Sequence, residues 1–272
     1  MILYHRFLKS ICYNKTMDIR GECMKDLTWL KHDLIAHRGL HQKDFSVVEN
    51  SITAFKEAIQ HGFSIECDIN VLKDGTVVVF HDKNLKRLCG IDLELSNVTY
   101  EEIKDLTLKN SKDYIPTLKE VLELVNGKVN LLIELKPHGN IEQLAKNFMD
   151  IISGYPGKFA VFSFHPGVVS WFKKYHPNIV RGQITEYFKD DEKMKPLMKY
   201  LMKTLFFNRF TKPDFISYGI YDLPNKWADK AKKRGITVIS YAARSQEQLN
   251  FVRSHYDNVV FEYFIPKQKS ES

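Results

Sequence analysis

The sequence predicts an α/β fold, a single (β/α)8 barrel, from two observations. Short runs rich in β-branched and aromatic residues alternate with longer runs that carry apolar residues at helical spacing, which is typical of parallel strands joined by helices. The length of 272 residues and the 44% hydrophobic content allow one large core of the size that such barrels have. No low-complexity linker divides the chain, so we expect one domain.

The expected elements follow one another in regular order. Strands are expected at residues 34–36, 64–71, 76–80, 129–135, 159–163, 179–184, 214–218, 236–241 and 258–261. Helical patterns cover residues 51–61, 118–125, 141–152, 166–175, 225–234 and 245–254. Counting the second and third strand runs as one barrel strand plus an excursion, with an Asp74-Gly75 turn between them, leaves eight repeats.

Two segments fall outside the repeats. Residues 82–114 fit no strand–helix pattern and are interpreted as a small insertion. Residues 1–30 form an N-terminal extension, which we expect to cover the lower end of the barrel formed by residues 31–272.

The composition bounds the compartment and the partners. The 40 lysine and arginine residues exceed the 33 acidic residues, so the net charge of +7 would attract an anionic substrate, a phospholipid headgroup or nucleic acid. No run approaches the roughly 18 apolar residues of a membrane-spanning helix. Residues 1–13 lack the continuous apolar stretch of a signal peptide, so we expect the cytoplasm. Cys12, Cys23, Cys67 and Cys89 have neither metal-site spacing nor disulfide density and are interpreted as structural thiols.

Paired carboxylates are the sharpest functional clue. Glu66 and Asp68 are two residues apart on an expected strand and therefore share a face, which the intervening apolar residues direct toward the barrel axis. The same alternation directs Glu134 and Lys136 inward from another strand. Each charge alone is explained by solvation at a strand end, but three converging carboxylates favour a site for a hard divalent cation, Mg²⁺ or Ca²⁺.

Two histidines end expected strands, and two cations lie near them. His37 and His81 are placed to divide the roles of base and acid in cleaving a phosphodiester, although a lone histidine is more often structural. Arg38 and Lys136 would bind phosphate oxygens, or pair with the carboxylates. Gly39 would let the backbone approach the phosphate closely.

At these residues the sequence resembles the glycerophosphodiester phosphodiesterase family, in order from about residue 34 to residue 263. Five motifs carry the resemblance: His37-Arg38-Gly39, Glu49-Asn50-Ser51, Glu66-Cys67-Asp68, His81-Asp82 and Glu134-Leu135-Lys136. The segment of residues 115–122 resembles the one that leads the family out of its insertion.

The resemblance implies a TIM barrel with the insertion after its second strand. It also implies a divalent metal on Glu66, Asp68 and Glu134, and acid/base catalysis by His37 and His81. By the same resemblance Glu49 and Asn50 support the metal site or bind the metal. The implied reaction is hydrolysis of a glycerophosphodiester to glycerol 3-phosphate and an alcohol.

The chain departs from the family pattern at several positions. Val48 replaces a usual proline, Tyr241 a common tryptophan and Arg244 a frequent asparagine, and the last strand ends in Phe261-Glu262 where Thr-Asp is more usual. We expect these departures to affect the pocket for the alcohol, for which Phe164 and Tyr241 are candidates, more than the metal and the histidines.

Residues 195–212 combine apolar and basic side chains after the fifth expected strand. One interpretation is a hydrophobic lid or a peripheral membrane contact. The other is a crossover helix whose apolar face packs on the barrel, which explains most amphipathic helices.

Three functions remain as alternatives. The first is the glycerophosphodiester hydrolase with a small-molecule substrate. The second is a lysophospholipase D-like or phospholipase-like enzyme that acts on membrane lipid. The third is a non-catalytic barrel that binds a phosphorylated ligand, which the two histidines argue against. Nucleic-acid binding is not expected, because no base-reading motif is present, and no pattern indicates an oligomeric state.

Overall fold

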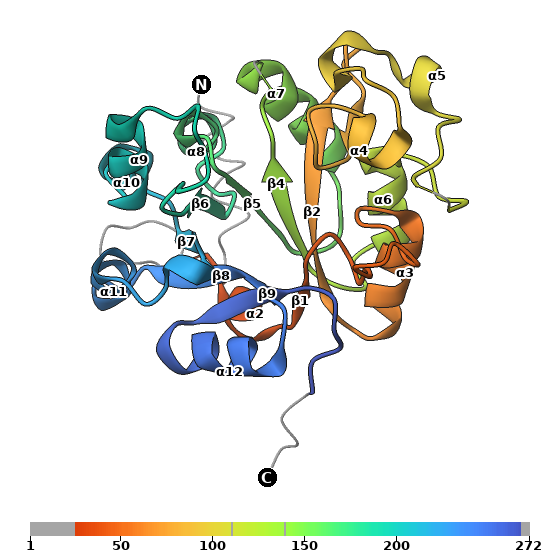
Figure 1. Ribbon diagram of the computed structural model, residues 1–272. Helices are drawn as coiled ribbons and strands as arrows, with labels where there is room; N and C mark the ends of the chain where they lie inside the picture. Colours follow the sequence, from red (N-terminus) through yellow and green to blue (C-terminus); the bar gives the residue numbers. More distant parts are fainter. Residues whose placement is uncertain (1–24, 110, 139, 268–272) are drawn as a thin grey trace.

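The computed structural model describes residues 25–109, 111–138 and 140–267. Within these ranges eight parallel strands close into a barrel, because β1 pairs with β2 on one side and with β9 on the other (Figure 1). In barrel order the strands are β1 (Ile35–Ala36), β2 (Ser64–Val71), β4 (Leu131–Leu135), β5 (Phe159–Ser163), β6 (Arg181–Thr185), β7 (Phe215–Gly219), β8 (Thr237–Ala243) and β9 (Asn258–Phe261). The expected (β/α)8 barrel is confirmed.

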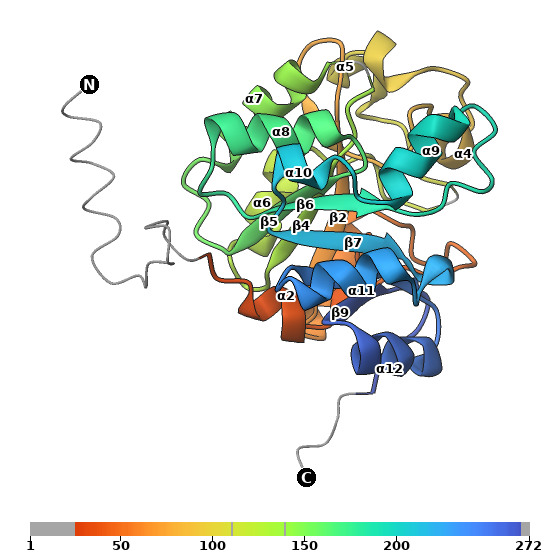
Figure 2. The same ribbon diagram turned by 90° about the vertical axis from the view of Figure 1, so that its left-hand side faces the viewer.

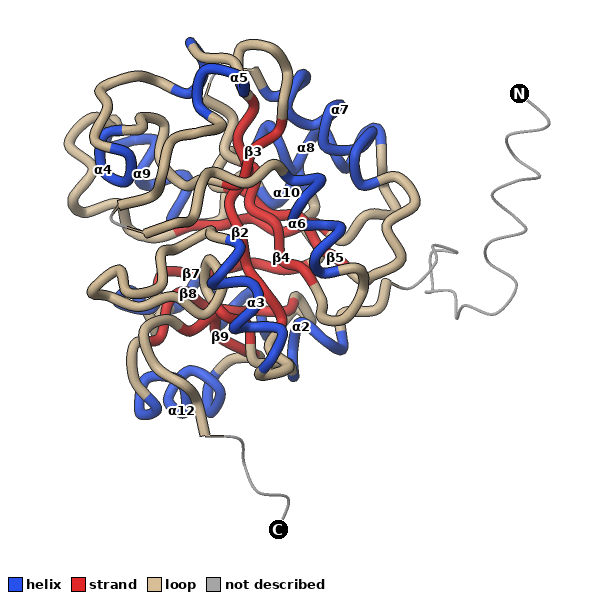
Figure 3. Tube along the Cα trace, turned by 90° about the vertical axis from the view of Figure 1, so that its right-hand side faces the viewer, coloured by secondary structure: helices blue, strands red, loops and turns tan. Residues whose placement is uncertain are grey.

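Helices surround the strands, as Figure 3 shows. They are α3 (Ile52–Gln60), α6 (Leu118–Val125), α7 (Ile141–Ile152), α8 (Pro166–Tyr175), α9 (Pro196–Lys203), α10 (Asn208–Thr211), α11 (Lys226–Lys233) and α12 (Gln246–His255), with a short 3-10 turn η2 (Ile220–Asp222) after β7. Local capping explains where several begin. The Ser51 side chain accepts a hydrogen bond from Ala54 N at the start of α3, and Thr117 and Glu120 form a capping box at the start of α6.

The excursion after β2 is an antiparallel strand, β3 (Val77–Val79). The Asp74-Gly75 turn reverses the chain as expected: Gly75 has a φ of 87°, and Thr76 N donates to Asp74 Oδ1 at 3.0 Å. The segment of residues 82–114, which we interpret as an insertion, contains α4 (Lys86–Cys89), η1 (Leu95–Asn97) and α5 (Tyr100–Ile103). A second small apolar core joins Leu88 and Ile103 of this segment to Phe80, which precedes it.

The amino end of the barrel is closed by α2 (Thr28–His32). Trp29 and Leu30 are buried against the side chains that fill the barrel interior, and Lys25 Nζ pairs with Asp214 Oδ2 at 2.7 Å just before β7. In Figure 2 the arrowheads of β6 and β7 point to the side where α4 and α9 lie, and α2 lies on the opposite side. Residues 25–30 thus lie at the lower end of the barrel, whereas residues 1–24 of the expected extension lie outside the described residues.

Two apolar layers hold the barrel together. The inner layer fills its axis with side chains such as Leu132, Phe162 and Phe215, and the outer layer lies between strands and helices. Cys67 is a buried free thiol in the outer layer and Cys89 a half-buried one, while Cys12 and Cys23 lie outside the described residues. None of the helices described is long and apolar enough to cross a bilayer.

Candidate active site

Strand register brings the predicted site residues together at the carboxyl end of the barrel. Ala36 is paired with Ile65 on β2 and with Phe261 on β9, so the next residues along these three strands lie at one level. Those residues are His37, Glu66 and Glu262. On the other side of β2, Asp68 is paired with Glu134 on β4.

The three predicted metal ligands form one cluster. One carboxylate oxygen each of Glu66, Asp68 and Glu134 lies within 4.8 Å of the other two, and all three residues are buried. Ile65 and Cys67 pack in the outer apolar layer, so the alternation of faces along β2 is the one the sequence predicts.

The electrostatics of the cluster are those of acids crowded together without water. Burial, with the charges of Asp68 and Glu134, raises the pKa of Glu66 well above its usual value. Burial also raises the pKa of Glu134 to about 7. Burial opposes the ionisation of Asp68 too, but the charges of Lys136 and Arg38 outweigh it and hold that pKa well below its usual value. The cluster therefore has a strong affinity for a proton or a cation.

The two predicted phosphate-binding cations lie against these carboxylates. Lys136 Nζ is 2.9 Å from Glu134 Oε1 and 3.3 Å from Asp68 Oδ1, and Arg38 Nε is 3.2 Å from Asp68 Oδ2. Despite these neighbours, Asp68 Oδ1 is buried without a hydrogen bond. Oxygen donors that converge in this way, one of them without a hydrogen bond, fit a hard divalent cation.

Glu49 and Asn50 lie beside the cluster with their polar atoms already engaged. Glu49 Oε1 accepts from Arg38 Nη1 at 2.6 Å, and Glu49 Oε2 accepts from Arg87 Nη1 at 2.7 Å. Asn50 Nδ2 donates to Asp68 Oδ2 at 2.9 Å, and Asn50 Oδ1 accepts from Asp68 N at 3.3 Å. These contacts orient Arg38 and Asp68.

His37 is held by a carboxylate from the last strand. Its Nδ1 lies 2.6 Å from Glu262 Oε2, and Arg244 Nε donates to Glu262 Oε1 at 2.7 Å. The His37 Nε2 atom lies 3.8 Å from Glu66 Oε2 and so faces the carboxylate cluster. Burial, with the charge of Arg38, lowers the pKa of His37 to about 4, although Glu262 acts in the opposite direction.

His81 reaches the cluster because β3 runs antiparallel to β2. The pairing of Val79 with Ile69 and the bond from Phe80 N to Asp68 O return the chain to the level of the carboxylates. His81 Nδ1 lies 2.7 Å from Asp82 Oδ1, and Arg87 links Asp82 to Glu49. Burial lowers the pKa of His81, while the charge of Asp68 raises it.

Gly39 is required by the local packing of the protein. Its φ is 78°, and a Cβ on it would come within 2.8 Å of the Ala54 carbonyl carbon. Glycine is required there because the turn after β1 packs closely on the start of α3.

The two candidates for the alcohol pocket meet at the rim of the barrel. The rings of Phe164 and Tyr241 lie edge to face with centres 5.8 Å apart, and Phe188 lies edge to face against Phe164 at 6.0 Å. Tyr241 Oη also donates to Glu186 Oε2 at 3.1 Å. Neither Phe188 nor Glu186 was predicted, although Glu186 follows Gly182 and Ile184 at the spacing of two that marks inward positions.

Two positions at which the chain departs from the family pattern, Arg244 and Glu262, lie near His37 rather than in the candidate pocket for the alcohol. Glu262 contacts His37 directly and Arg244 contacts Glu262, so the expectation that the departures stay apart from the histidines is wrong for these two positions. The signal was present in the alternation of Asn258, Val260 and Glu262 along the last strand. Its meaning required the pairing of β9 with β1, which only barrel closure supplies.

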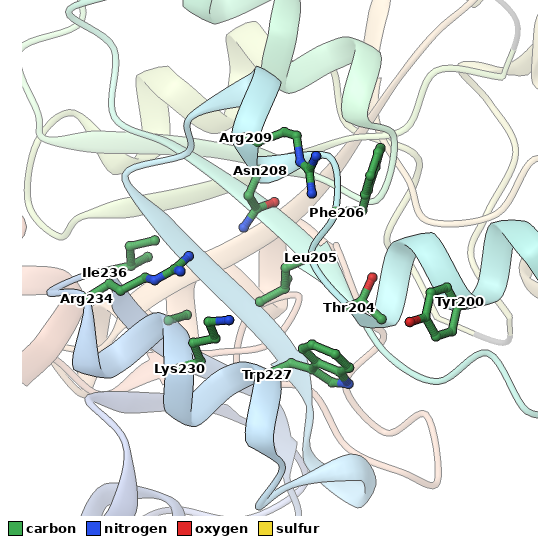
Figure 4. Close-up of a pocket in the computed structure, with 11 residues that line it drawn as sticks. Tyr200, Thr204, Leu205, Phe206, Asn208, Arg209, Trp227, Lys230, Arg234 and Ile236 are labelled. Carbon is green, nitrogen blue, oxygen red and sulfur yellow. The ribbon is translucent and has the colours of Figure 1, made fainter.

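Residues 195–212 form α9 and α10 and follow neither interpretation fully. Met202 is buried and Leu205 packs on the outer layer, as in a crossover helix, but Leu197, Met198 and Phe210 are exposed. Between α9, α10 and α11 lies a hollow of about 450 Å³ (Figure 4). Its lining includes the aromatic residues Phe206 and Trp227 and the cations Arg209, Lys230 and Arg234, and it contains none of the predicted site residues.

Comparison with known proteins agrees with this geometry. The family model described as the glycerophosphoryl diester phosphodiesterase family matches residues 37–259. A glycerophosphodiester phosphodiesterase of Bacillus altitudinis is 32% identical over 165 residues, which are 56% of this chain and 66% of that protein. A human lysophospholipase D is 33% identical over 135 residues, 44% of this chain and 41% of that protein. The chain thus spans less than two thirds of either relative.

A solved structure shows the same fold. A phosphodiesterase of Oleispira antarctica, in complex with the product sn-glycerol-3-phosphate, gives a TM-score of 0.72 at 20% identity, over 86% of this chain and 94% of that one. The family model covers residues 37–259, a range that contains all five motifs and ends within β9. The chain belongs to the glycerophosphoryl diester phosphodiesterase family.

Proposed function

We propose that this protein hydrolyses glycerophosphodiesters to glycerol 3-phosphate and an alcohol, using Mg²⁺ or Ca²⁺ held by Glu66, Asp68 and Glu134. The observation that carries the proposal is the convergence of these three buried carboxylates beside a histidine whose Nε2 faces them. When bound, the cation would polarise a phosphoryl oxygen and offset the charge that develops there. Its charge would also offset the burial and the mutual repulsion that raise the pKa values of Glu66 and Glu134.

His37 is the base in this proposal. Hydrogen bonds to His37 and Arg244 keep the Glu262 carboxylate ionised. It accepts a hydrogen bond from His37 Nδ1–H, so the other ring nitrogen, Nε2, carries no proton. The low pKa of His37 keeps the ring neutral near pH 7. Nε2 then removes the proton from the attacking hydroxyl, which belongs to water or to the glycerol of the substrate.

His81 is the acid, and it protonates the departing alkoxide. Its side chain is more exposed than that of His37, 31% against 15%, and Asp82 stabilises its protonated form. Arg38 and Lys136 bind the phosphate oxygens. They pair with carboxylates as well, and the two roles are compatible, because a cation at Asp68 and Glu134 would free their N–H groups for the substrate.

Glu49 and Asn50 act as supports rather than metal ligands in this proposal. Both oxygens of Glu49 accept hydrogen bonds from arginine, so Glu49 holds Arg38 in place. Asn50 is bonded to the Asp68 carboxylate and so fixes the direction in which that ligand points.

A second candidate activity uses the same centre on a lysophospholipid. The exposed Leu197, Met198 and Phe210 favour it, since apolar residues on a basic surface suit a membrane contact, and the human relative named a lysophospholipase D supports it. A non-catalytic binding barrel is disfavoured, because it would have no need of two histidines each held by a carboxylate.

The decisive test is release of glycerol 3-phosphate from glycerophosphocholine with Mg²⁺ or Ca²⁺ present. Loss of the base in His37→Ala should lower kcat by about 10² to 10⁴-fold, and Glu66→Ala should abolish turnover and weaken metal binding. The exposed-residue change Glu123→Gln is the matched control. Full activity of either site variant would falsify the assignment, and parallel assays with a lysophospholipid separate the two candidate activities.

A further inference from the structure

Glu186 is half-buried and directly follows the last residue of β6. Ile184 belongs to the apolar interior of the barrel, and residues two apart on a strand share a face, so Glu186 continues toward the carboxyl end that holds the metal cluster. Tyr241, from β8, reaches across β7 to donate a hydrogen bond to Glu186 Oε2. Gly219 at the end of β7 leaves room for this contact, since a Cβ there would come within 3.3 Å of Oε2.

Aromatic rings connect Glu186 to the place where the phosphate would bind. Lys136 Nζ lies 5.9 Å from the centre of the Phe164 ring, and Phe164 packs edge to face on Tyr241. Phe188, which is buried, flanks Phe164 from the loop that follows Glu186. Outward from the carboxylate cluster, Lys136, which we propose binds phosphate, therefore comes first, and Glu186 comes last. Between them lies an aromatic wall made of Phe164, Phe188 and Tyr241.

Glu186 has no cationic partner among the residues described. Its hydrogen-bond donor is the neutral Tyr241 hydroxyl, and the charges around it are those of Asp190, Asp191 and Asp222. Of these, Asp222 is paired with Lys189 Nζ at 2.8 Å. A half-buried carboxylate among like charges is stabilised by a positive charge brought by a ligand.

We propose that Glu186, with Phe164, Phe188 and Tyr241, binds the ammonium group of the alcohol part of the substrate. This inference rests on the proposed function and narrows it to glycerophosphodiesters of amino alcohols, primary or quaternary. In such substrates an ethylene bridge joins the ester oxygen to the ammonium, so the cation would lie on the aromatic wall while the phosphate contacts Lys136. Aromatic faces attract ammonium groups, and the carboxylate adds a full opposite charge.

The test compares kcat/KM on two diesters that differ in the charge of the alcohol, glycerophosphocholine and glycerophosphoglycerol. Glu186→Gln keeps the shape of the side chain and its acceptor for Tyr241 but removes the charge. It should lower kcat/KM on the choline diester by roughly 10- to 100-fold while changing the value on the glycerol diester by less than about threefold. Glu186→Lys should reverse the preference between the two substrates. Glu192→Gln, an exposed change in the same loop, is the control and should alter neither value.

Equal losses on the two substrates, or no loss on either, would overturn the ammonium site. Failure of the proposed function has a different signature: the unaltered protein would release glycerol 3-phosphate from neither diester. In that event calorimetric titration of the two diesters into the unaltered protein and Glu186→Gln gives the answer. Weaker binding of the choline diester alone in the variant supports the site, and unchanged binding overturns it.

Discussion

Glu262 holds the imidazole of His37, the residue that we propose as the base. Its two oxygens are divided between His37 Nδ1 and Arg244 Nε, and its side chain is almost fully buried. In the proposed mechanism the Nδ1 proton is directed to Glu262, and the neutral ring would present its lone pair at Nε2 toward the cluster of Glu66, Asp68 and Glu134. We therefore regard Glu262 as a positioning residue.

Replacing Glu262 by Gln should lower kcat by about 10- to 100-fold with little change in KM, because an amide can stabilise the wrong tautomer of His37. The Glu262 charge raises the pKa of His37, so its removal should shift the acidic limb of the kcat/KM profile to lower pH. Steady-state kinetics across pH measure both effects. Glu262→Asp should recover part of the rate, and Glu247→Gln on α12 is the exposed control. An unchanged pH profile with an unchanged kcat would show that Glu262 has no such role.

At the residue scale, the sequence predicts the direction of a side chain within one strand. It does not predict contacts between side chains of different strands. Alternation within β2 was enough to direct Glu66 and Asp68 to the same face. Glu262 and Glu186 follow the same alternation, but their partners His37 and Tyr241 lie on other strands. Those contacts depend on how the barrel closes, and short-range patterns carry no information on closure.

Among the elements, β3 and the insertion explain why a residue outside the eight barrel strands enters the site. The antiparallel return of β3 brings His81 back to Asp68, and the insertion then supplies Arg87, which binds both Asp82 and Glu49. The turn signal predicted the reversal, and the misfit to a strand–helix repeat predicted the insertion. The second apolar core of the insertion could not be foreseen, since its members, such as Leu88 and Leu72, come from separate segments.

The helices α9 and α10 carry the exposed apolar and basic surface on which the proposed membrane contact depends. Leu197 is 69% exposed and Met198 42%, and among the described residues no carboxylate pairs with Arg209, Lys230 or Arg234 around the neighbouring hollow (Figure 4). Apolar side chains would enter the interface while the cations contact anionic headgroups.

Co-sedimentation with vesicles that contain anionic phospholipid measures this contact. The double change Leu197→Ser with Met198→Ser should weaken binding by about 10-fold or more, since each exposed apolar side chain contributes on the order of 1 kcal/mol. Binding should also fall as salt is raised, because the basic residues act through screened charges. Phe251→Ser on α12 is the matched exposed control. Equal binding of the double variant and the unaltered protein would leave α9 as a packing helix only.

At the scale of the whole molecule, closure of the barrel buries the acidic residues of β2 and β4 close together. Burial there disfavours the ionised forms of their carboxyl groups. The number of strands and their order were predictable from the alternation of strand and helix patterns, because each crossover helix covers one step of a parallel sheet. The raised pKa of Glu134 was not predictable from the sequence, since it depends on the burial and on the neighbouring charges that the closed barrel provides.

Metal binding should therefore stabilise the protein more at high pH than at low pH. Without metal the folded state holds a proton on Glu134 with a pKa of about 7 against a usual 4.5, so this group stabilises the fold at low pH and the contribution is lost as pH rises toward 7. A divalent cation competes with that proton. The rise in Tm on adding Mg²⁺ or Ca²⁺ should be small near about pH 5.5 and reach roughly 5 to 10 °C near about pH 8 at a hundredfold excess over Kd. Differential scanning calorimetry with metal or chelator measures it, and Glu66→Gln should lose most of the rise while Glu123→Gln keeps it. A metal effect that is equal at both pH values, or that survives Glu66→Gln, would mean that the cation binds elsewhere on the chain.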